Sequence, residues 1–323
     1  KQNGMTLPAE YLPETESYSY PDLEVGDWVV AEYLDPLNNE ALIPSGILSP
    51  RILFQGFDMP TVEQIFEVYA KKGPQLIWTS RGAAPTPTAV QVGHFEGLRF
   101  KRRGAKMAIA EPHSIEAEDV LPSVRTGRGV DLGESIKILR NQVLAFRQGS
   151  PRLREWVAAK AGSGAPEAQM RNVIEGIRQE IEPYGGMTTR HVSKAIDQGM
   201  GNRAQALSVA LEILGVAHQL LLVQPSARLP EGRLTTAFQF GYPVIRLQDG
   251  RIIDPNHPRA QDGFVPFPYL GGKAIIAWPA LAPLNVVDLP KKPKVDESRR
   301  IEAHLHLKAT GVITGEVLET ISG

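Results

Sequence analysis

Hydrophobic residues recur every three or four positions through the middle of the chain, which is the period of an amphipathic α-helix. Ile136, Leu139 and Val143 follow this pattern within residues 134–147. The same reading predicts helices at 151–161, 166–181 and 202–214, and a short helix at 191–197. Asn202 precedes the clearest of these helices and is well placed to cap its first turn.

Short apolar runs separated by turn residues lie on both sides of these helices and are typical of β-strands. Before the helices, the runs occupy residues 28–33, 65–69, 75–78, 95–100 and 107–111. After them, the runs occupy 219–223, 244–247, 251–253 and 274–278, and the alternating runs at 301–307 and 312–321 predict a β-hairpin. The early runs predict a sandwich or an open barrel. Together these patterns predict an α+β protein.

Changes in the pattern divide the chain into four expected segments. Residues 1–20 show no period and predict a disordered lead-in, while residues 21–125 predict a β-sandwich-like domain. Residues 126–289 combine helices and strands in an α+β core. Residues 290–323 predict a charged linker and the first hairpin of a further β-domain, because two strands are too few to fold alone.

The composition limits the chemistry that the chain can perform. Of its 323 residues, 42% are hydrophobic, which is sufficient for a buried core, and the net charge is −1. This balance gives no global field that attracts nucleic acid or an anionic membrane, so we expect neither partner. The most apolar stretch, 274–287, is broken by prolines and is too short to span a membrane. The absence of cysteine excludes disulfides, thiolate metal sites and a cysteine nucleophile.

One segment has an order of elements that suggests a family. Residues 201–207 read Gly-Asn-Arg-Ala-Gln-Ala-Leu at the start of a helix, and Gly-Val-Ala follows that helix at 215–217. A buried strand, a second strand and a third strand that ends at Asp254 come next. This order resembles the core of the transglutaminase-like branch of the papain superfamily. In that family a cysteine at the helix N-terminus, a histidine on a later strand and an aspartate form a catalytic triad.

The resemblance implies that this triad is degenerate. The cysteine position falls on Asn202, the histidine position on Tyr242 and the aspartate position on Asp254. An amide is not a nucleophile at neutral pH, and a phenol with a pKa of about 10 is a poor base. We therefore expect a protein that is not an enzyme. In structural terms, Asn202 is expected to cap its helix, Asp254 to form a turn, and Tyr242 to pack its ring, with Asp254 as a candidate hydrogen-bond partner.

A second interpretation keeps catalysis in a rebuilt site. The cleft residues would be Gly201 and Arg203 at the helix N-terminus, with His218 and His257 as the imidazoles able to approach Asp254. Such a site would make the protein a cysteine-independent amidase or peptidase. Ser208 lies too deep within the helix to act as its nucleophile.

The remaining clusters of polar residues predict no cofactor and no metal. His304 and His306 share one strand face, but we expect a solvated face because no third ligand is evident. A basic cluster is also expected to be solvated and comprises Arg99, Lys101, Arg102, Arg103 and Lys106.

The resemblance extends to a bacterial multidomain arrangement, in which a β-sandwich domain precedes the transglutaminase-like core and a further β-domain follows it. It implies a non-catalytic scaffold or a protein- or peptide-binding module, with a protein or peptide partner, inside a longer bacterial protein. Members of this arrangement are often exported, so a periplasmic or cell-surface location is expected. A structural spacer in a cell-envelope assembly is the remaining alternative.

Overall fold

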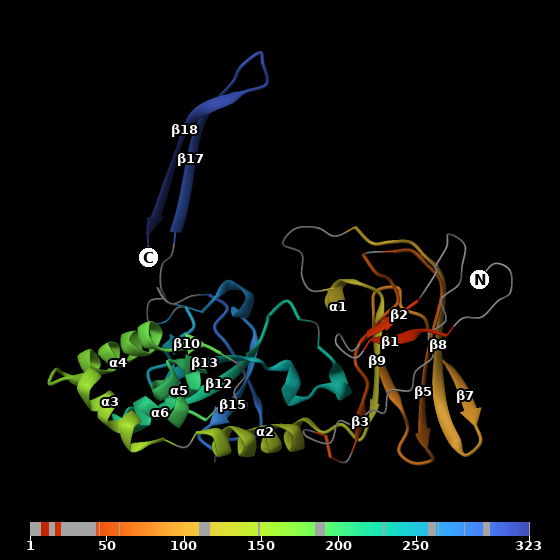
Figure 1. Ribbon diagram of the computed structural model, residues 1–323, viewed down its shortest axis with the longest axis horizontal. Coiled ribbons are helices and arrows are strands. Elements are labelled where there is room, and N and C mark those ends of the chain that lie inside the picture. Colours follow the sequence, from red (N-terminus) through yellow and green to blue (C-terminus); the bar gives the residue numbers. More distant parts are fainter. Residues whose placement is uncertain are drawn as a thin grey trace. The chain divides into compact units, whose positions relative to one another are not determined.

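The computed structural model describes residues 8–12, 17–20, 43–44, 46–57, 59–109, 117–147, 149–184, 191–228, 230–257, 263, 265–280, 282–292 and 298–322. The chain forms two compact units, Lys1–Asn38 and Asn39–Gly323. Helices and antiparallel sheets occur together in the second unit (Figure 1), which confirms the predicted α+β class. The strand predicted at 28–33 lies outside the described residues.

The first unit contains a pair of short antiparallel strands, β1 (Glu10–Leu12) and β2 (Ser17–Ser19). Tyr11 lies directly opposite Tyr18 in this pair. The disordered lead-in predicted at 1–20 is therefore corrected for these residues. Aromatic residues favour strands, and strands of three residues are too short to show a period in the sequence.

Two antiparallel sheets form the β-rich part of the second unit. The first contains β3 (Ile47–Leu48), β9 (Ser123–Arg128), β4 (Ile52–Leu53) and β6 (Ile77–Arg81), and the other three strands all pair with β9. The second contains β5 (Thr61–Lys71), β8 (Phe95–Ala105) and β7 (Thr88–Val92), with β8 in the centre. Residues of both sheets share one apolar cluster around Phe54, Phe100 and Val124. The arrangement is therefore sandwich-like, and neither sheet closes into a barrel.

Two details of this β-rich part differ from the prediction. Strand β9 continues past the expected boundary at residue 125 as far as Arg128. The described residues of the strand predicted at 107–111 are not in a strand, and Met107 and Ile109 are exposed. Their alternating pattern therefore has no partner strand in the part of the chain that the structure describes. A short helix, α1 (Ala117–Val120), precedes β9.

The helices of the core have the bounds that the hydrophobic period predicts to within a few residues. They are α2 (Leu132–Phe146), α3 (Pro151–Ala161), α4 (Pro166–Glu180), α5 (Ser193–Gln198) and α6 (Arg203–Ile213). Asp131 and Ser150 accept backbone N–H groups at the starts of α2 and α3. These caps satisfy donors that the first turn leaves without partners.

The core sheet has the order β14 (Ile252–Ile253), β13 (Tyr242–Leu247), β12 (His218–Gln224), β15 (Lys273–Trp278) and β16 (Val286–Asp288). Leu220, Leu222 and Ile245 belong to the apolar cluster that includes α2 to α6. Leu221 and Val223 belong to a second cluster on the opposite face. The helices therefore cover one face of the sheet, and α6 is buried along most of its length. The loop between β12 and β13 contains two short 3₁₀ helices, η1 (Gly232–Leu234) and η2 (Ala237–Gln239), and a third, η3 (Phe267–Tyr269), precedes β15.

Two further strand pairs complete the described structure. β10 (Glu182–Pro183) lies parallel to β11 (Met200–Gly201), just before α6. β17 (Ser298–Leu307) and β18 (Ile313–Ser322) form the predicted hairpin. Among the described residues, no helix has both the length and the apolar character that crossing a membrane requires.

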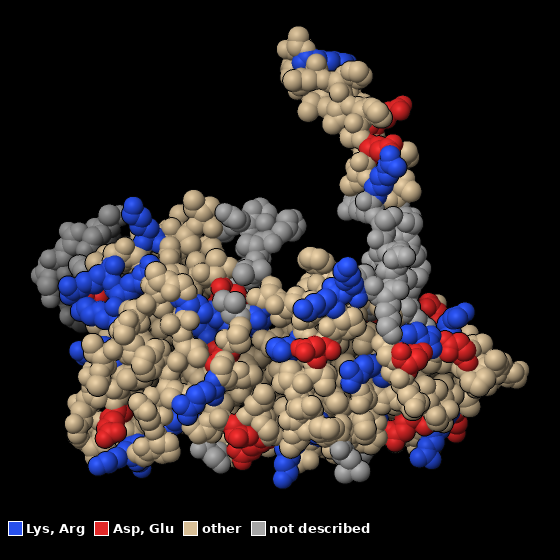
Figure 2. Space-filling model, turned by 180° about the vertical axis from the view of Figure 1, so that it is seen from behind, with Lys and Arg blue, Asp and Glu red and all other residues tan. Residues whose placement is uncertain are grey.

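The basic cluster predicted to be solvated lies mainly on β8, where acidic residues of β5 face it. Arg99 pairs with Glu67, and Glu63 pairs with both Lys101 and Arg103. Basic and acidic side chains also occur together on the face shown in Figure 2. The positive charge of the strand is thus largely matched by its neighbour.

Candidate functional site

The structure joins two of the three residues at the expected triad positions. The hydroxyl of Tyr242, at the start of β13, donates to Oδ2 of Asp254 at 2.5 Å. Asp254 follows β14 and is 0% exposed, and its Oδ1 accepts the backbone N–H of Asn256 at 2.9 Å. Burial, followed by the hydrogen bond to the Asp254 carboxylate, raises the pKa of the Tyr242 hydroxyl above its usual value. Tyr242 is therefore a fixed donor and a poor proton acceptor.

The third residue, Asn202, has a separate structural role. Its side-chain oxygen accepts the backbone N–H of Gln205 at 3.0 Å, which makes it the N-cap of α6. The Tyr242 ring stacks on Tyr269 and packs with the second apolar cluster, whereas α6 packs within the first. Among the described contacts, no hydrogen bond joins Asn202 to Tyr242 or Asp254.

The expected cleft residues beside Asn202 hold neighbouring segments together. The Arg203 guanidinium donates to the backbone oxygens of Ile181 at 2.5 Å and Arg178 at 2.7 Å. These carbonyls lie at the C-terminal end of α4 and lack partners within that helix. Gly201 is buried, and a Cβ at this position would lie 3.0 Å from the side chain of Ala195. Both residues thus fix how α6 starts against α4 and α5.

His218 is half-buried and lies in a polar cluster with the buried Ser208. Its Nε2 is 2.7 Å from the Ser208 hydroxyl, and its Nδ1 is 2.8 Å from the carbonyl oxygen of Val216. Because a carbonyl only accepts, Nδ1 carries the hydrogen and Nε2 accepts the hydrogen of Ser208. Arg147 also donates to the Ser208 oxygen, and its guanidinium lies 4.1 Å from the centre of the Trp278 ring.

The environment of this cluster favours neutral imidazole. Burial is the main cause that lowers the pKa of His218, and the nearby Arg147 charge lowers it further. A serine hydroxyl that donates to a neutral imidazole is the arrangement in which the serine is a nucleophile and the histidine its base. Ser208, however, is 0% exposed. The serine is therefore enclosed within the core, whereas His218 is half-buried.

His257 lies three residues after Asp254 and is exposed. Both oxygens of the Asp254 carboxylate have partners, and neither partner is an imidazole. Within the described residues, no three acidic or histidine side chains are grouped so that they could hold a metal ion.

A buried ionic network links the β-rich part to the loop between β12 and β13. Glu231 is 3% exposed, and its carboxylate accepts from Arg51, from Arg81 at 2.9 Å and from the Thr79 hydroxyl at 3.0 Å. Arg81 also pairs with Asp119. These residues come from positions 51 to 231, and each lies in an unremarkable local sequence. No local pattern in the sequence indicates the network, because only the fold brings its members together.

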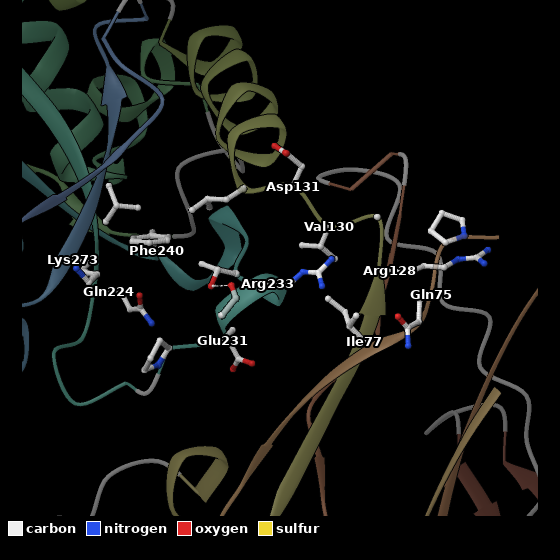
Figure 3. A pocket seen from close by; sticks show the side chains of 17 residues that line it. Gln75, Ile77, Arg128, Val130, Asp131, Gln224, Glu231, Arg233, Phe240 and Lys273 are labelled. Atoms are coloured by element: carbon white, nitrogen blue, oxygen red, sulfur yellow. Dashed lines mark hydrogen bonds between the residues drawn. The ribbon is translucent and has the colours of Figure 1, made fainter. Parts of the chain in front are cut away.

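A pocket with a volume of about 670 Å³ lies beside this network (Figure 3). Its walls come from the segment before β6, the end of β9, the first turn of α2, the η1 loop and the ends of β12 and β15. Gln224, Arg233, Phe240 and Lys273 are among the residues that line it. The sequence marks only one of these residues, the polar Gln224 at the end of an apolar strand, and gives no sign that the others surround it.

Comparisons with known proteins bear on the fold. No protein-family model matches the chain, and no curated protein matches it. A crystal structure from Parabacteroides distasonis, described as a "putative protease", is similar over 77% of this chain, with a TM-score of 0.55 and 12% sequence identity. The chain spans 48% of the length of that protein. At 12% identity this similarity shows a shared fold and nothing about activity. The chain is therefore an α+β protein whose fold resembles that of the Parabacteroides protein.

Proposed function

We propose that this chain is a non-catalytic, transglutaminase-like module that binds a protein or peptide. The observation that carries the proposal is the hydrogen bond between Tyr242 and Asp254, which leaves neither side chain available to activate a nucleophile. Both oxygens of Asp254 are bound, Tyr242 is held protonated, and the third position is a helix cap. No cysteine exists anywhere in the chain to supply a thiolate.

The order of elements supports the transglutaminase-like part of the proposal. Helix α6, the turn at 215–217, strands β12, β13 and β14 and the terminal Asp254 follow one another as the resemblance implies. A fold that keeps this order while its reactive groups are replaced retains surfaces for binding but lacks a nucleophile.

The second candidate is a hydrolase, and the hydrogen bond between Ser208 and His218 favours it. This pair has the chemistry of a serine nucleophile and its base. The complete burial of Ser208 argues against it, because a substrate carbonyl would need access to the hydroxyl. A serine-directed fluorophosphonate probe separates the two candidates, since labelling at Ser208 would support the hydrolase.

The central test is incubation of the purified chain with a pool of peptides, followed by mass spectrometry of the products. The proposal expects unchanged peptides, with neither hydrolysis nor amide cross-links. Turnover that disappears in Asp254→Ala would overturn it. The double variant Asn202→Cys and Tyr242→His tests the assignment of positions, because a reactive thiol would appear only if the helix N-terminus still activates it.

A further inference from the structure

The pocket beside the Glu231 network is lined by the side-chain amide of a residue that is itself mostly buried. Gln224, the last residue of β12, is 8% exposed and lines the pocket. In the described part of the chain, its side-chain amide makes no hydrogen bond. The amide atoms themselves are not enclosed, because they are absent from the fully buried polar atoms without a partner, so they face accessible space. Figure 3 shows the Gln224 amide extending into the pocket, where a ligand or water can satisfy it.

The pocket also contains a cation whose charge is not matched. Figure 3 shows the Arg233 guanidinium extending from η1 into the space toward Val130 and Ile77. Within the described residues, Arg233 has no carboxylate partner. The other basic residues of the lining are engaged differently, since Lys273 pairs with Asp288 and Arg128 donates to the carbonyl of Lys71.

The acidic residues of the lining do not neutralise Arg233. The Glu231 carboxylate is bound by Arg51 and Arg81, and it points away from Arg233 in Figure 3. The Asp131 carboxylate caps α2 by accepting the backbone N–H of Glu134 at 2.7 Å. The charge presented to a ligand is therefore positive.

Apolar residues form much of the remaining lining, namely Ile77, Val130, Leu132, Phe240, Val286 and two prolines. Gln75 and Thr235 add polar groups to it. A volume of about 670 Å³ is within the range of sites that enclose small ligands or a short peptide segment. A primary amide both donates and accepts, which matches the two hydrogen-bonding groups of a peptide bond.

We propose that this pocket binds a short peptide segment that carries a carboxylate. Arg233 binds the carboxylate, Gln224 binds an adjacent peptide group, and an apolar side chain packs near Phe240. This inference rests on the proposed binding function and assigns its site and the chemistry of its ligand. The carboxylate belongs either to an acidic side chain or to a peptide C-terminus, and both have the charge and geometry that a guanidinium recognises.

The experiment is a binding screen of the full chain on arrays of randomised, N-acetylated hexapeptides. One array carries C-terminal amides and the other carries free C-terminal carboxylates. The best binders are then measured in solution with the parent chain, Arg233→Gln and Gln224→Leu. Arg128→Gln is the matched control, because it makes the same substitution in the lining of the same pocket at a guanidinium that points away in Figure 3.

We expect the amidated binders to be enriched in Asp and Glu, or the free-carboxylate array to bind better than the amidated one. Arg233→Gln should weaken binding by about tenfold or more, as expected for the loss of a charge-assisted hydrogen bond. Gln224→Leu should weaken it by about threefold to tenfold. Arg128→Gln should change it by less than about twofold, because a distant surface charge contributes little.

The outcomes separate this inference from the proposed function. Binders without carboxylates, or binders that Arg233→Gln retains, overturn the inference and leave a peptide-binding function at another site. Absence of any binder overturns both. Cleavage of array peptides by the parent chain overturns the non-catalytic function, whereas the Arg233 dependence of binding still tests the site.

Discussion

The Asp254 carboxylate needs hydrogen-bond donors because it is completely buried. Tyr242 supplies one through its hydroxyl, and the backbone of Asn256 supplies the other. In a catalytic triad the same aspartate would orient an imidazole. Here its partner is a phenol that stays protonated, so the pair is suited to stability rather than to proton transfer.

Tyr242→Phe should therefore destabilise the fold. The substitution keeps the ring but leaves Oδ2 of the buried Asp254 without a donor, which costs about 1–3 kcal/mol. The free energy of unfolding in urea measures the effect. Tyr69→Phe is the matched control, because the Tyr69 hydroxyl donates to Glu67 in an exposed setting and its loss should cost less than about 0.5 kcal/mol. Equal effects of the two substitutions would contradict the structural role of Tyr242.

His218 makes stability depend on pH. Its imidazole is half-buried in the folded chain, and desolvation followed by the Arg147 charge lowers its pKa, which favours the neutral form. In the unfolded chain a histidine takes up a proton at a pH of about 6.5. As the pH falls below that value, the unfolded state binds more protons than the folded state, and stability decreases toward the lower pKa of the folded state.

We expect the free energy of unfolding to fall between about pH 7 and pH 5, with part of that slope absent in His218→Gln. Chemical denaturation at several pH values measures the slope. His304→Gln removes a histidine from the exposed strand β17 and should leave the slope as in the parent chain. Stability that rises on acidification through this range would contradict the assignment of a neutral His218.

At the scale of elements, α6 depends on both its sequence and its surroundings. Its residues from Ala204 to Leu211 are buried, so packing on both sides holds the helix more firmly than propensity alone. Its start is fixed locally, since the Asn202 side chain binds the N–H of Gln205. The position of the expected nucleophile therefore acts as a cap.

Removal of that cap should lower stability. Asn202→Ala should cost about 0.5–2 kcal/mol, while Asn202→Asp should cost little because aspartate accepts the same hydrogen bond. Thermal unfolding of both variants measures the difference. A loss of stability in Asn202→Asp as large as in Asn202→Ala would show that Asn202 acts through something other than its accepting oxygen.

The sequence predicted the helices and the core strands because their signals are local. Hydrophobic period and capping residues lie within one element, and α3 has the predicted bounds, Pro151–Ala161. Weak local signals explain the differences, such as the strand pair at β1 and β2 and the absence of a strand at Met107. The pocket and the polar clusters could not be predicted, because their members meet only through tertiary contacts, as Arg51 and Glu231 do across 180 positions.

At the scale of the whole second unit, the Glu231 network joins the first β-sheet to the loop that precedes β13. Arg51 and Arg81, together with Thr79 of β6, hold a single carboxylate that is nearly inaccessible to solvent. A buried ion pair is costly to assemble, but removal of one partner is more costly, because the other charges stay buried without compensation. The network therefore makes the sheet and the loop depend on each other.

Glu231→Gln should destabilise the chain by about 3–5 kcal/mol, because it leaves the buried Arg51 guanidinium without its carboxylate and Arg81 with Asp119 alone. Hydrogen exchange should show the largest loss of protection in β6, which contains Arg81, in η1, which follows Glu231, and in β9, where Ser123 accepts a hydrogen bond from Arg51 at 3.3 Å. Glu167→Gln is the matched control, since Glu167 pairs with Arg251 at an exposed site and its loss should cost less than about 1 kcal/mol. If protection decreased only in η1 while β6 and β9 were unchanged, the sheet would be stable without Glu231, and the pocket beside it would not depend on the network for its shape.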